Sequence, residues 1–474
     1  MSDRAILALS VAYLAALFLI AWAGDRRPAG RRAPVIYPLA LGIYCTSWTF
    51  YGAVGVAARD GFDFLSIYVG PILVIGLGWP LIARMVRIAR AENVVSISDF
   101  ISARYGKSRR LAVLVTVTAL AALLPYFALQ LKAISISFET LAAGAAVGSL
   151  PGGTTLTVAV SMAAFSVLFG VRSVQANEHH RGLMLALAAE SVVKLGAALA
   201  VGGAVTWAAF FGSGPAADLG AVVRVDPEMT RIFAPATLDA GWWLTAVVAG
   251  LAFLCLPRQF HVTVLENVHT DDVRTAAWSF PLYLLAINLF VVPVALVGMA
   301  LFPPGSVAPD TFMVAIPLSL GWDALAFLAF LGGLAAATGM IIVGTLALGI
   351  MVSNDIILPL LARSRRLRRR WDANPGPALL MARRVSVVGI MALAYACHLA
   401  LGSAFPLATI GLISFVGVAQ FAPALIGGLV WRRGTEAGAV AGIAVGFAGW
   451  AYVVAVPAFA TAGWIAADLV AAGP

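Results

Sequence analysis

Charge is scarce in this chain of 474 residues, of which only 11% are Asp, Glu, Lys or Arg while 61% are hydrophobic. A soluble domain carries about 25% charged residues, and no soluble core could bury so much apolar surface. A mean hydropathy of +0.95 over this length indicates a chain that crosses a membrane many times. The scarcity of charge therefore excludes a soluble globular domain and predicts an all-α polytopic membrane protein.

Cysteine is also scarce, with three residues, Cys45, Cys255 and Cys397, far apart and each in an apolar run. They define neither a disulfide framework nor a zinc site. The stretch "CLPRQFHVTVLENVH" brings two histidines eight residues apart, but no second ligand pair accompanies them. Because no nucleophile motif, paired carboxylates or metal cluster emerges, we expect no enzymatic activity, no metal and no cofactor.

The net charge of +9 does not indicate a nucleic-acid partner, because the basic residues fall in short connectors between apolar runs. Apolar runs long enough to cross a bilayer lie at roughly 4–24, 35–57, 62–86, 110–145, 155–172, 182–211, 239–257, 275–302, 320–361, 382–401, 405–431 and 436–457. A short final stretch, "FATAGWIAADLVAAGP", is a weak thirteenth candidate, so we expect 12–13 transmembrane helices. The long run 320–361 is predicted to be one tilted helix.

The distribution of Lys and Arg among the connectors is an independent test of the number of spans. The connectors after the first, third, fifth, seventh, ninth and eleventh runs hold most of the Lys and Arg, whereas the opposite connectors hold Arg4, Arg59, Arg224 and Arg231. The positive-inside rule then places the basic connectors, including residues 258–274, in the cytoplasm and the N-terminus outside. We expect a multi-pass protein of the inner (cytoplasmic) cell membrane. The cluster "RSRRLRRR" is predicted to contact anionic membrane lipid or a partner domain.

Ionisable residues at bilayer depth are costly and are the first candidates for function. Glu190 and Lys194 stand one helical turn apart in "LAAESVVKLGAALA". They are interpreted either as a neutralised pair packed against neighbouring helices or as groups that take part in proton coupling or gating.

A second set lies in "PYFALQLKAISISFET", where Lys132 and Glu139 are seven residues apart and share a helix face. With Tyr126 and Gln130 they predict a polar stripe that lines a cavity, with interhelical packing as the alternative.

The second span, "LGIYCTSWTFYGAVGVAARDG", is rich in glycine and hydroxyl residues where plain hydrocarbon is expected. Transporters interrupt helices at the midplane so that freed carbonyls hold substrate and ions, although small residues also allow close helix packing. The ninth span, "FLGGLAAATGMIIVGTLALG", offers a second face of this kind. We expect a water-reachable pocket midway across the membrane, near Trp48 and Ala336.

Several motifs together resemble a known family. They are "YCTSWTFYGAVG", "SISDFISARYGKSRRLA", "AAESVVKLGA", "CLPRQFHVTVLENVH", "ALGIMVSNDI" and "FVGVAQFAPALIGGLVWRRGTEAGAVAG", which extend over nearly the whole chain. The chain resembles the sodium:solute symporter family, and within it the transporter-like membrane domain of sensor histidine kinases that control carbon and nitrogen use.

The resemblance implies a leucine-transporter-like fold with two inverted five-helix repeats. A single transporter domain over 1–474 would then divide into a peripheral first span (1–34), a first repeat (35–211), a second repeat (239–431) and peripheral C-terminal spans (432–474).

The resemblance also implies an ion site between the second and ninth spans. Backbone carbonyls at about Gly42 and Cys45 and another at Ala336 would contribute, with two hydroxyl side chains on the ninth span. Those two positions read Gly339 and Met340 here, which supply no hard oxygen from their side chains, although Thr338 lies nearby. Sodium and proton coupling therefore both remain open, with Glu190 or Glu139 as conceivable proton carriers.

Two functions follow. The first is a secondary transporter of a small polar organic solute, in particular an amino acid, by alternating access, with Trp48, Tyr51, Tyr126 and Gln130 lining the cavity. The second is a solute-sensing input module for a cytoplasmic histidine kinase. No phospho-acceptor or nucleotide-binding motif occurs in the chain, and its abrupt "AADLVAAGP" ending is expected of a membrane module from a longer protein.

Overall fold

A computed structural model describes residues 3–26, 34–142, 153–170, 181–212, 232–233, 238–363, 375–401 and 404–464. These residues are almost entirely helical, and no strand occurs among them. Residues 171–180, 213–231, 364–374 and 465–474 lie outside the described ranges. The predictions for "RSRRLRRR" beyond Arg363 and for the weak thirteenth span therefore remain predictions.

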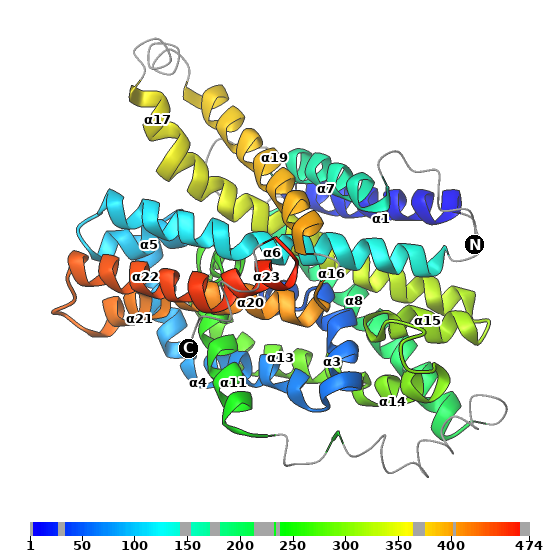
Figure 1. The fold of residues 1–474 in the computed structure, drawn as a ribbon. Helices are drawn as coiled ribbons and strands as arrows, with labels where there is room; N and C mark the ends of the chain where they lie inside the picture. Colours follow the sequence, from blue (N-terminus) through cyan, green and yellow to red (C-terminus); the bar gives the residue numbers. More distant parts are fainter. Residues whose placement is uncertain are drawn as a thin grey trace.

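The helices run side by side in one bundle (Figure 1). In the first half the elements are α1 (Asp3–Arg26), α2 (Ile36–Leu41), η1 (Gly42–Tyr44), η2 (Trp48–Gly52), α3 (Ala53–Asp60), α4 (Asp63–Ala91), α5 (Ile97–Arg104), α6 (Arg109–Leu141), α7 (Thr154–Gly170) and α8 (Arg181–Phe210). In the second half they are α11 (Ala240–Cys255), α12 (Pro257–Phe260), η5 (His261–Leu265), α13 (Thr270–Asn288), α14 (Val291–Leu301), η6 (Pro309–Thr311), α15 (Phe312–Ser319), α16 (Asp323–Met351), η7 (Val352–Ile357), α17 (Leu358–Arg363), α19 (Pro375–Leu401), α20 (Leu407–Ala419), α21 (Ala422–Val430), α22 (Glu436–Trp450), η8 (Ala451–Ala455) and α23 (Val456–Thr461).

Within the described residues, nine helices are long and apolar enough to cross a membrane, and two bent pairs of shorter helices raise the number of spans to as many as eleven. Each predicted apolar run coincides with one or more of these elements, and α7 is a shorter apolar helix. The run predicted to be a single long helix is one span, Asp323–Arg363, of 41 residues. The chain is therefore an all-α polytopic membrane protein.

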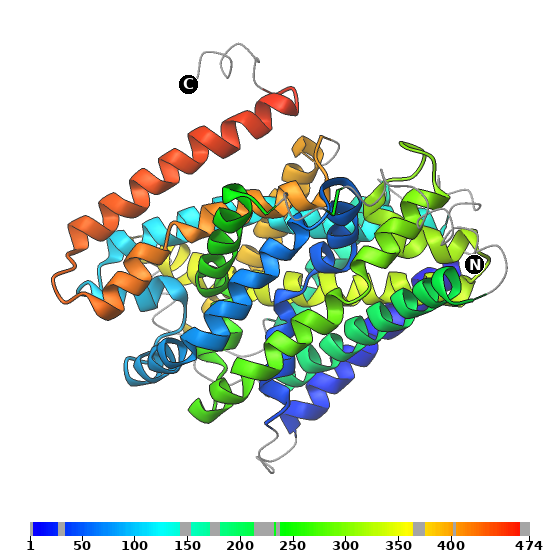
Figure 2. The ribbon, with the colours of Figure 1, turned by 90° about the horizontal axis from the view of Figure 1, so that it is seen from below.

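The span that begins with α16 lies at the centre of the bundle. In its most apolar window 83% of residues are buried, compared with 17% for the spans that contain α1 and α22. α16 packs against α8, α6, α19 and α15. Figure 2 shows α22 along one side of the bundle and α1 along the other.

The two ends of the bundle differ in charge. One end, called here the basic end, carries Arg84, Arg90, Arg104 and Arg109, and the opposite end carries Arg59 and Asp310. At the opposite end Asp310 accepts hydrogen bonds from the Arg59 guanidinium (3.2 Å) and the Leu407 backbone N–H (3.1 Å), which tie α3 and the start of α20 together.

The first bent pair, called here the first broken span, joins Ile36–Tyr44 to Trp48–Asp60 with a bend of 69°. Cys45 has an extended backbone conformation, and the Thr46 hydroxyl accepts a hydrogen bond from the Trp48 N–H at 3.3 Å. Such a side chain competes with the helical backbone for hydrogen bonds. The interruption predicted for the second span is present.

The second bent pair, called here the second broken span, joins Ala240–Cys255 to Pro257–Leu265 with a bend of 55°. Pro257 opens the new helix, and Leu256 before it is extended, because a residue that precedes proline disfavours the helical region. The prediction that 258–274 is a cytoplasmic connector is wrong for its first part. Arg258, Gln259 and the following residues through Val264 are buried, and the connector to α13 shrinks to Glu266–His269.

Candidate functional site

The two broken spans face each other inside the bundle. Tyr37 in the first broken span donates its hydroxyl to the Thr263 carbonyl of the second (2.8 Å). Arg258 of the second donates from Nη1 to the Ile43 carbonyl of the first (3.4 Å). Interrupted helices that meet in this way bring unpaired backbone groups to one region of the interior, which is where transporters hold their solutes and ions.

Lys194 on α8 fills the first interruption. Its ammonium Nζ donates to the Gly42 carbonyl (2.5 Å) and to the Cys45 carbonyl (2.8 Å). Gly42 allows this approach because a Cβ at that position would lie 2.6 Å from the Ser191 hydroxyl of α8. The cation that contacts two of the predicted ion-binding carbonyls is therefore a side chain of the protein itself.

Glu190, one turn earlier on α8, contacts α16 instead. Its carboxylate accepts a hydrogen bond from the Thr338 hydroxyl (2.8 Å), and a Cβ on Gly339 would meet its Oε2 at 2.2 Å. Thr338 thus faces α8, two residues after the buried Ala336. No Glu190–Lys194 ion pair within 4.0 Å is recorded among the described residues, so each of the two charged groups makes its hydrogen bonds to a different helix.

Three of the four residues predicted to line the solute cavity gather at the first interruption. The Tyr126 hydroxyl lies 3.0 Å from the Thr46 hydroxyl, and the Gln130 side-chain oxygen accepts from the Ser47 hydroxyl (2.7 Å). Trp48 follows directly in the chain, and its indole N–H has no partner. All three predicted side chains are at most 5% exposed, so the structure is closed around them.

The fourth predicted residue, Tyr51, lies elsewhere. Its hydroxyl donates to the Ala329 carbonyl of α16 (3.2 Å), and its ring occupies the space left by Gly333. The glycine-rich face of the ninth span therefore accommodates aromatic side chains of the first broken span.

The polar stripe predicted on α6 is not formed as one surface. Lys132 donates to the Phe405 carbonyl (2.6 Å) near the opposite end, and Glu139 is exposed close to the end of α6. Residues 130 and 132 are two apart, so an α-helix directs them to different sides, whereas Tyr126 and Gln130 are four apart and share one. Neither Lys132 nor Glu139 belongs to the site at the two interruptions.

Arg258 is the residue of this region that the sequence did not single out. It is fully buried, with its guanidinium carbon 4.7 Å from the centre of the Tyr126 ring. Its Nε and Nη2 atoms have no hydrogen-bond partner. The available signal was Pro257, which directly follows the apolar run and marks a new helix start inside the membrane.

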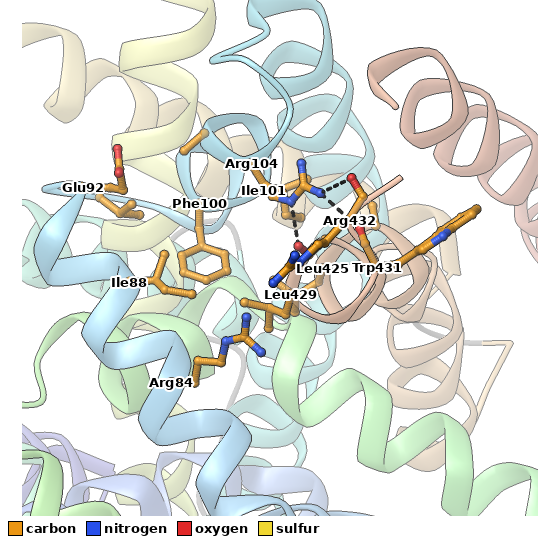
Figure 3. A pocket seen from close by; sticks show the side chains of 14 residues that line it. Arg84, Ile88, Glu92, Phe100, Ile101, Arg104, Leu425, Leu429, Trp431 and Arg432 are labelled. Carbon is orange, nitrogen blue, oxygen red and sulfur yellow. Dashed lines mark hydrogen bonds between the residues drawn. The ribbon is translucent and has the colours of Figure 1, made fainter. Parts of the chain in front are cut away.

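The recorded cavities that touch described residues lie toward the basic end. One of about 360 Å³ opens between α4, α5 and α21, with Arg84, Glu92 and Phe100 among its lining residues (Figure 3). Arg104 there donates from Nε to the Gly428 carbonyl (2.7 Å), which caps the end of α21. Neither Trp48 nor Ala336 lines this cavity or two others toward the same end, and both residues are at most 5% exposed, so the structure is closed around them.

A second cavity, of about 570 Å³, lies beside Asp99 and Asp355. The Asp355 carboxylate accepts hydrogen bonds from the hydroxyls of Ser98 and Thr116, both at 2.6 Å, and so links η7 to α5 and α6. Burial raises the pKa of Asp99 above its usual value, against the lowering effect of the Val95 backbone N–H that donates to it. These contacts join the two halves of the chain at the basic end.

Among the described residues, no group of three or more His, Cys, Asp and Glu side chains is placed to hold a metal ion. Two of the predicted ion ligands, the Gly42 and Cys45 carbonyls, accept hydrogen bonds from Lys194, and Thr338 donates its hydroxyl to the Glu190 carboxylate.

No protein-family model matches the sequence, and no curated protein is detectably similar to it. Solved structures are similar in fold. The substrate-bound, outward-open state of a Na⁺-coupled sialic acid symporter aligns with a TM-score of 0.63 and 13% identity, over 97% of this chain and 98% of that chain. A manganese transporter from Eremococcus coleocola aligns with a TM-score of 0.43 and 14% identity, over 92% and 96%. The first of these likenesses, to a membrane transporter, shows that the chain shares its fold.

Proposed function

We propose that this protein is a secondary transporter of a small polar organic solute, of the amino-acid class, that works by alternating access and is coupled to protons rather than to sodium. The fold supports transport, and two helix interruptions that meet in the interior support a central solute site. The subgroup resemblance of the sequence supports the amino-acid class.

The observation that carries the coupling proposal is the position of the Lys194 ammonium on the Gly42 and Cys45 carbonyls. A sodium ion at these carbonyls would have to displace a tethered cation of the same charge. A lysine, unlike sodium, can lose its charge by giving up a proton, and a buried lysine does so more readily than an exposed one.

Cys45, Glu190 and Arg258 lie close enough to Lys194 to interact with it electrostatically, and Tyr13 of α1 lies close enough to interact with Glu190. The protonated Lys194 ammonium holds the first interruption to α8 through two charge-assisted hydrogen bonds, and deprotonation removes the positive charge and so weakens both of them. The ion that drives transport would in this way control the contact between α8 and the first broken span.

Uptake of labelled amino acids into proteoliposomes, with sodium and proton gradients imposed separately, tests this proposal. We expect uptake driven by an inward proton gradient and unchanged when choline replaces sodium. Uptake that requires a sodium gradient would overturn the coupling. Binding without uptake under either gradient would overturn transport and favour a solute-sensing module, whose histidine kinase partner would then be the next object of study.

A further inference from the structure

We propose that the Arg258 guanidinium is the anchor for a carboxylate group of the solute that this protein binds. This inference rests on the proposed transport function in one respect, which is that Arg258 lies on the path of the solute. It assigns a binding residue and a chemical requirement to a position outside the four residues predicted to line the cavity.

The first ground is the unused hydrogen-bonding capacity of the side chain. Arginine carries five N–H donors, and the edge formed by Nε and one terminal nitrogen matches the two oxygens of a carboxylate. In Arg258 the atoms of this edge, Nε and Nη2, are the ones without a partner, while Nη1 makes a long contact to the Ile43 carbonyl at 3.4 Å. The donors left free are those that a carboxylate binds in pairs.

The second ground is charge. Arg258 is fully buried, and within the described part of the chain no carboxylate lies within 4.0 Å of it. A second cation, Lys194, is close enough to interact with it, and Glu190 is already bonded to Thr338. Buried charges normally have a partner, because an unpaired ion is expensive to desolvate. An anionic ligand supplies the missing negative charge.

The contact with Tyr126 does not replace such a ligand. A cation above an aromatic ring gains electrostatic attraction, but the ring satisfies none of the N–H donors. The ring does hold the guanidinium in place, since Tyr126 is itself fixed by its contact with Thr46 and packs 5.7 Å from the Phe415 ring.

The surroundings fit the rest of an organic carboxylate. Tyr126, Phe415 and Tyr44 present aromatic faces around the second interruption, with the Tyr44 and Phe415 rings 6.1 Å apart. The Trp48 indole N–H in the first broken span and the Ser414 hydroxyl on α20 are further buried polar groups without a hydrogen-bond partner. Such a site, apolar with a few oriented polar groups, is typical of small-molecule recognition. Because the structure is closed here, entry of the solute requires the helices to separate.

The test uses the full-length protein, purified and reconstituted in lipid nanodiscs. Thermal-shift screening would cover the common L-amino acids, short mono- and dicarboxylates, and the matching primary amides and decarboxylated amines, and titration calorimetry would follow for the strongest stabiliser. We expect every stabilising compound to carry a carboxylate and its amide to bind about a hundredfold more weakly, because the amide leaves one buried donor unpaired.

Two variants separate the role of the edge donors from that of charge. Arg258→Lys retains the positive charge but loses the paired donors, and we expect it to bind the same carboxylate at least about tenfold more weakly. Arg258→Gln removes both and should show no saturable binding. Arg274→Gln, at an exposed position of α13, is the matched control and should bind as the wild type does.

The inference is overturned if an amide or amine binds as tightly as its acid, if Arg258→Lys binds unchanged, or if no carboxylate in the set binds. A carboxylate that binds through Arg258 but is not taken up would overturn transport and leave the inference standing. If a neutral or cationic solute is taken up and Arg258→Lys does not change that uptake, the carboxylate inference is overturned and the proposed transport function is retained.

Discussion

Lys194 and Arg258 are both fully buried cations near the same helix interruptions, and the fold treats them differently. Lys194 donates to two carbonyls that the first interruption leaves free, and one turn away Glu190 adds a negative charge bonded to α16. Arg258 has one long hydrogen bond, one aromatic contact and two donors without a partner. The first cation has its hydrogen-bond partners within the chain, whereas the second keeps two donors without a partner in the described part of the chain.

The polar groups at a helix interruption can be paired within the chain, or they can be left without a partner. Free backbone groups inside a membrane must find partners, because no water is present to supply them. At the first interruption α8 supplies the partner from within the chain. At the second, the chain places a buried charged side chain with two donors that lack a partner, which is costly unless a ligand binds them.

The largest effect is expected for Lys194→Met. The change leaves the Gly42 and Cys45 carbonyls without their donor and Glu190 without a neighbouring positive charge, which should lower the free energy of unfolding by about 3–5 kcal/mol. Denaturant unfolding of the purified protein in detergent measures it. Addition of Glu190→Gln should recover part of the loss. A decrease below about 1 kcal/mol would remove Lys194 from the structural role assigned to it.

Thr338→Val should follow, with a loss of about 2 kcal/mol, because it removes the hydroxyl that donates to the buried Glu190 carboxylate. Thr345→Val is the matched control, since Thr345 is equally buried on α16 but donates only to carbonyls of its own helix, at Ile341 and Ile342. The control should change the stability by less than about 1 kcal/mol. Equal losses in the two variants would mean that the Glu190 contact adds nothing.

Gly339→Ala should cost about 1–2 kcal/mol, because the added Cβ would lie 2.2 Å from Glu190 Oε2 and displace the carboxylate from its hydrogen bond with Thr338. Gly389→Ala on α19 meets no atom within 4 Å and should be neutral or slightly stabilising. The same unfolding measurement applies. Tolerance of alanine at 339 would show that Glu190 is not held as tightly as its contacts indicate.

The smallest effect is expected for Arg258→Met in the absence of solute. Loss of the cation–π contact and of the bond to Ile43 opposes relief from an unpaired buried charge, so the stability should change by less than about 1 kcal/mol or rise. The same denaturant measurement on Lys194→Met and Arg258→Met gives the difference in stability between the two cations. A loss as large as that of Lys194→Met would show that Arg258 is a structural residue.

The helices could be predicted from the sequence because each apolar run of bilayer length has one outcome in lipid. The run 110–145 became Arg109–Leu141, and 320–361 became Asp323–Arg363. The interruption in the second span was also predicted, since glycine and hydroxyl residues at bilayer depth are local signals.

The site was predicted only in part. Trp48, Tyr126 and Gln130 meet at the first interruption, while Tyr51 faces α16 and Lys132 and Glu139 lie apart. Arg258 was assigned to a connector because a polar stretch after an apolar run normally marks the membrane boundary. Here the polar residues begin at a proline within the interior, and only Pro257 distinguishes the two cases.

Hydropathy and the length of each apolar run were enough to identify a many-helix membrane protein and the approximate bounds of most spans, because both are local properties of the chain. The partners of the buried charges depend instead on the packing of the helices. Glu190 and Lys194 suggest a pair through their spacing, yet Lys194 reaches carbonyls about 150 residues away and Glu190 reaches α16. Which carbonyls are free, and which donors remain unpaired, depends on how helices distant in sequence pack together.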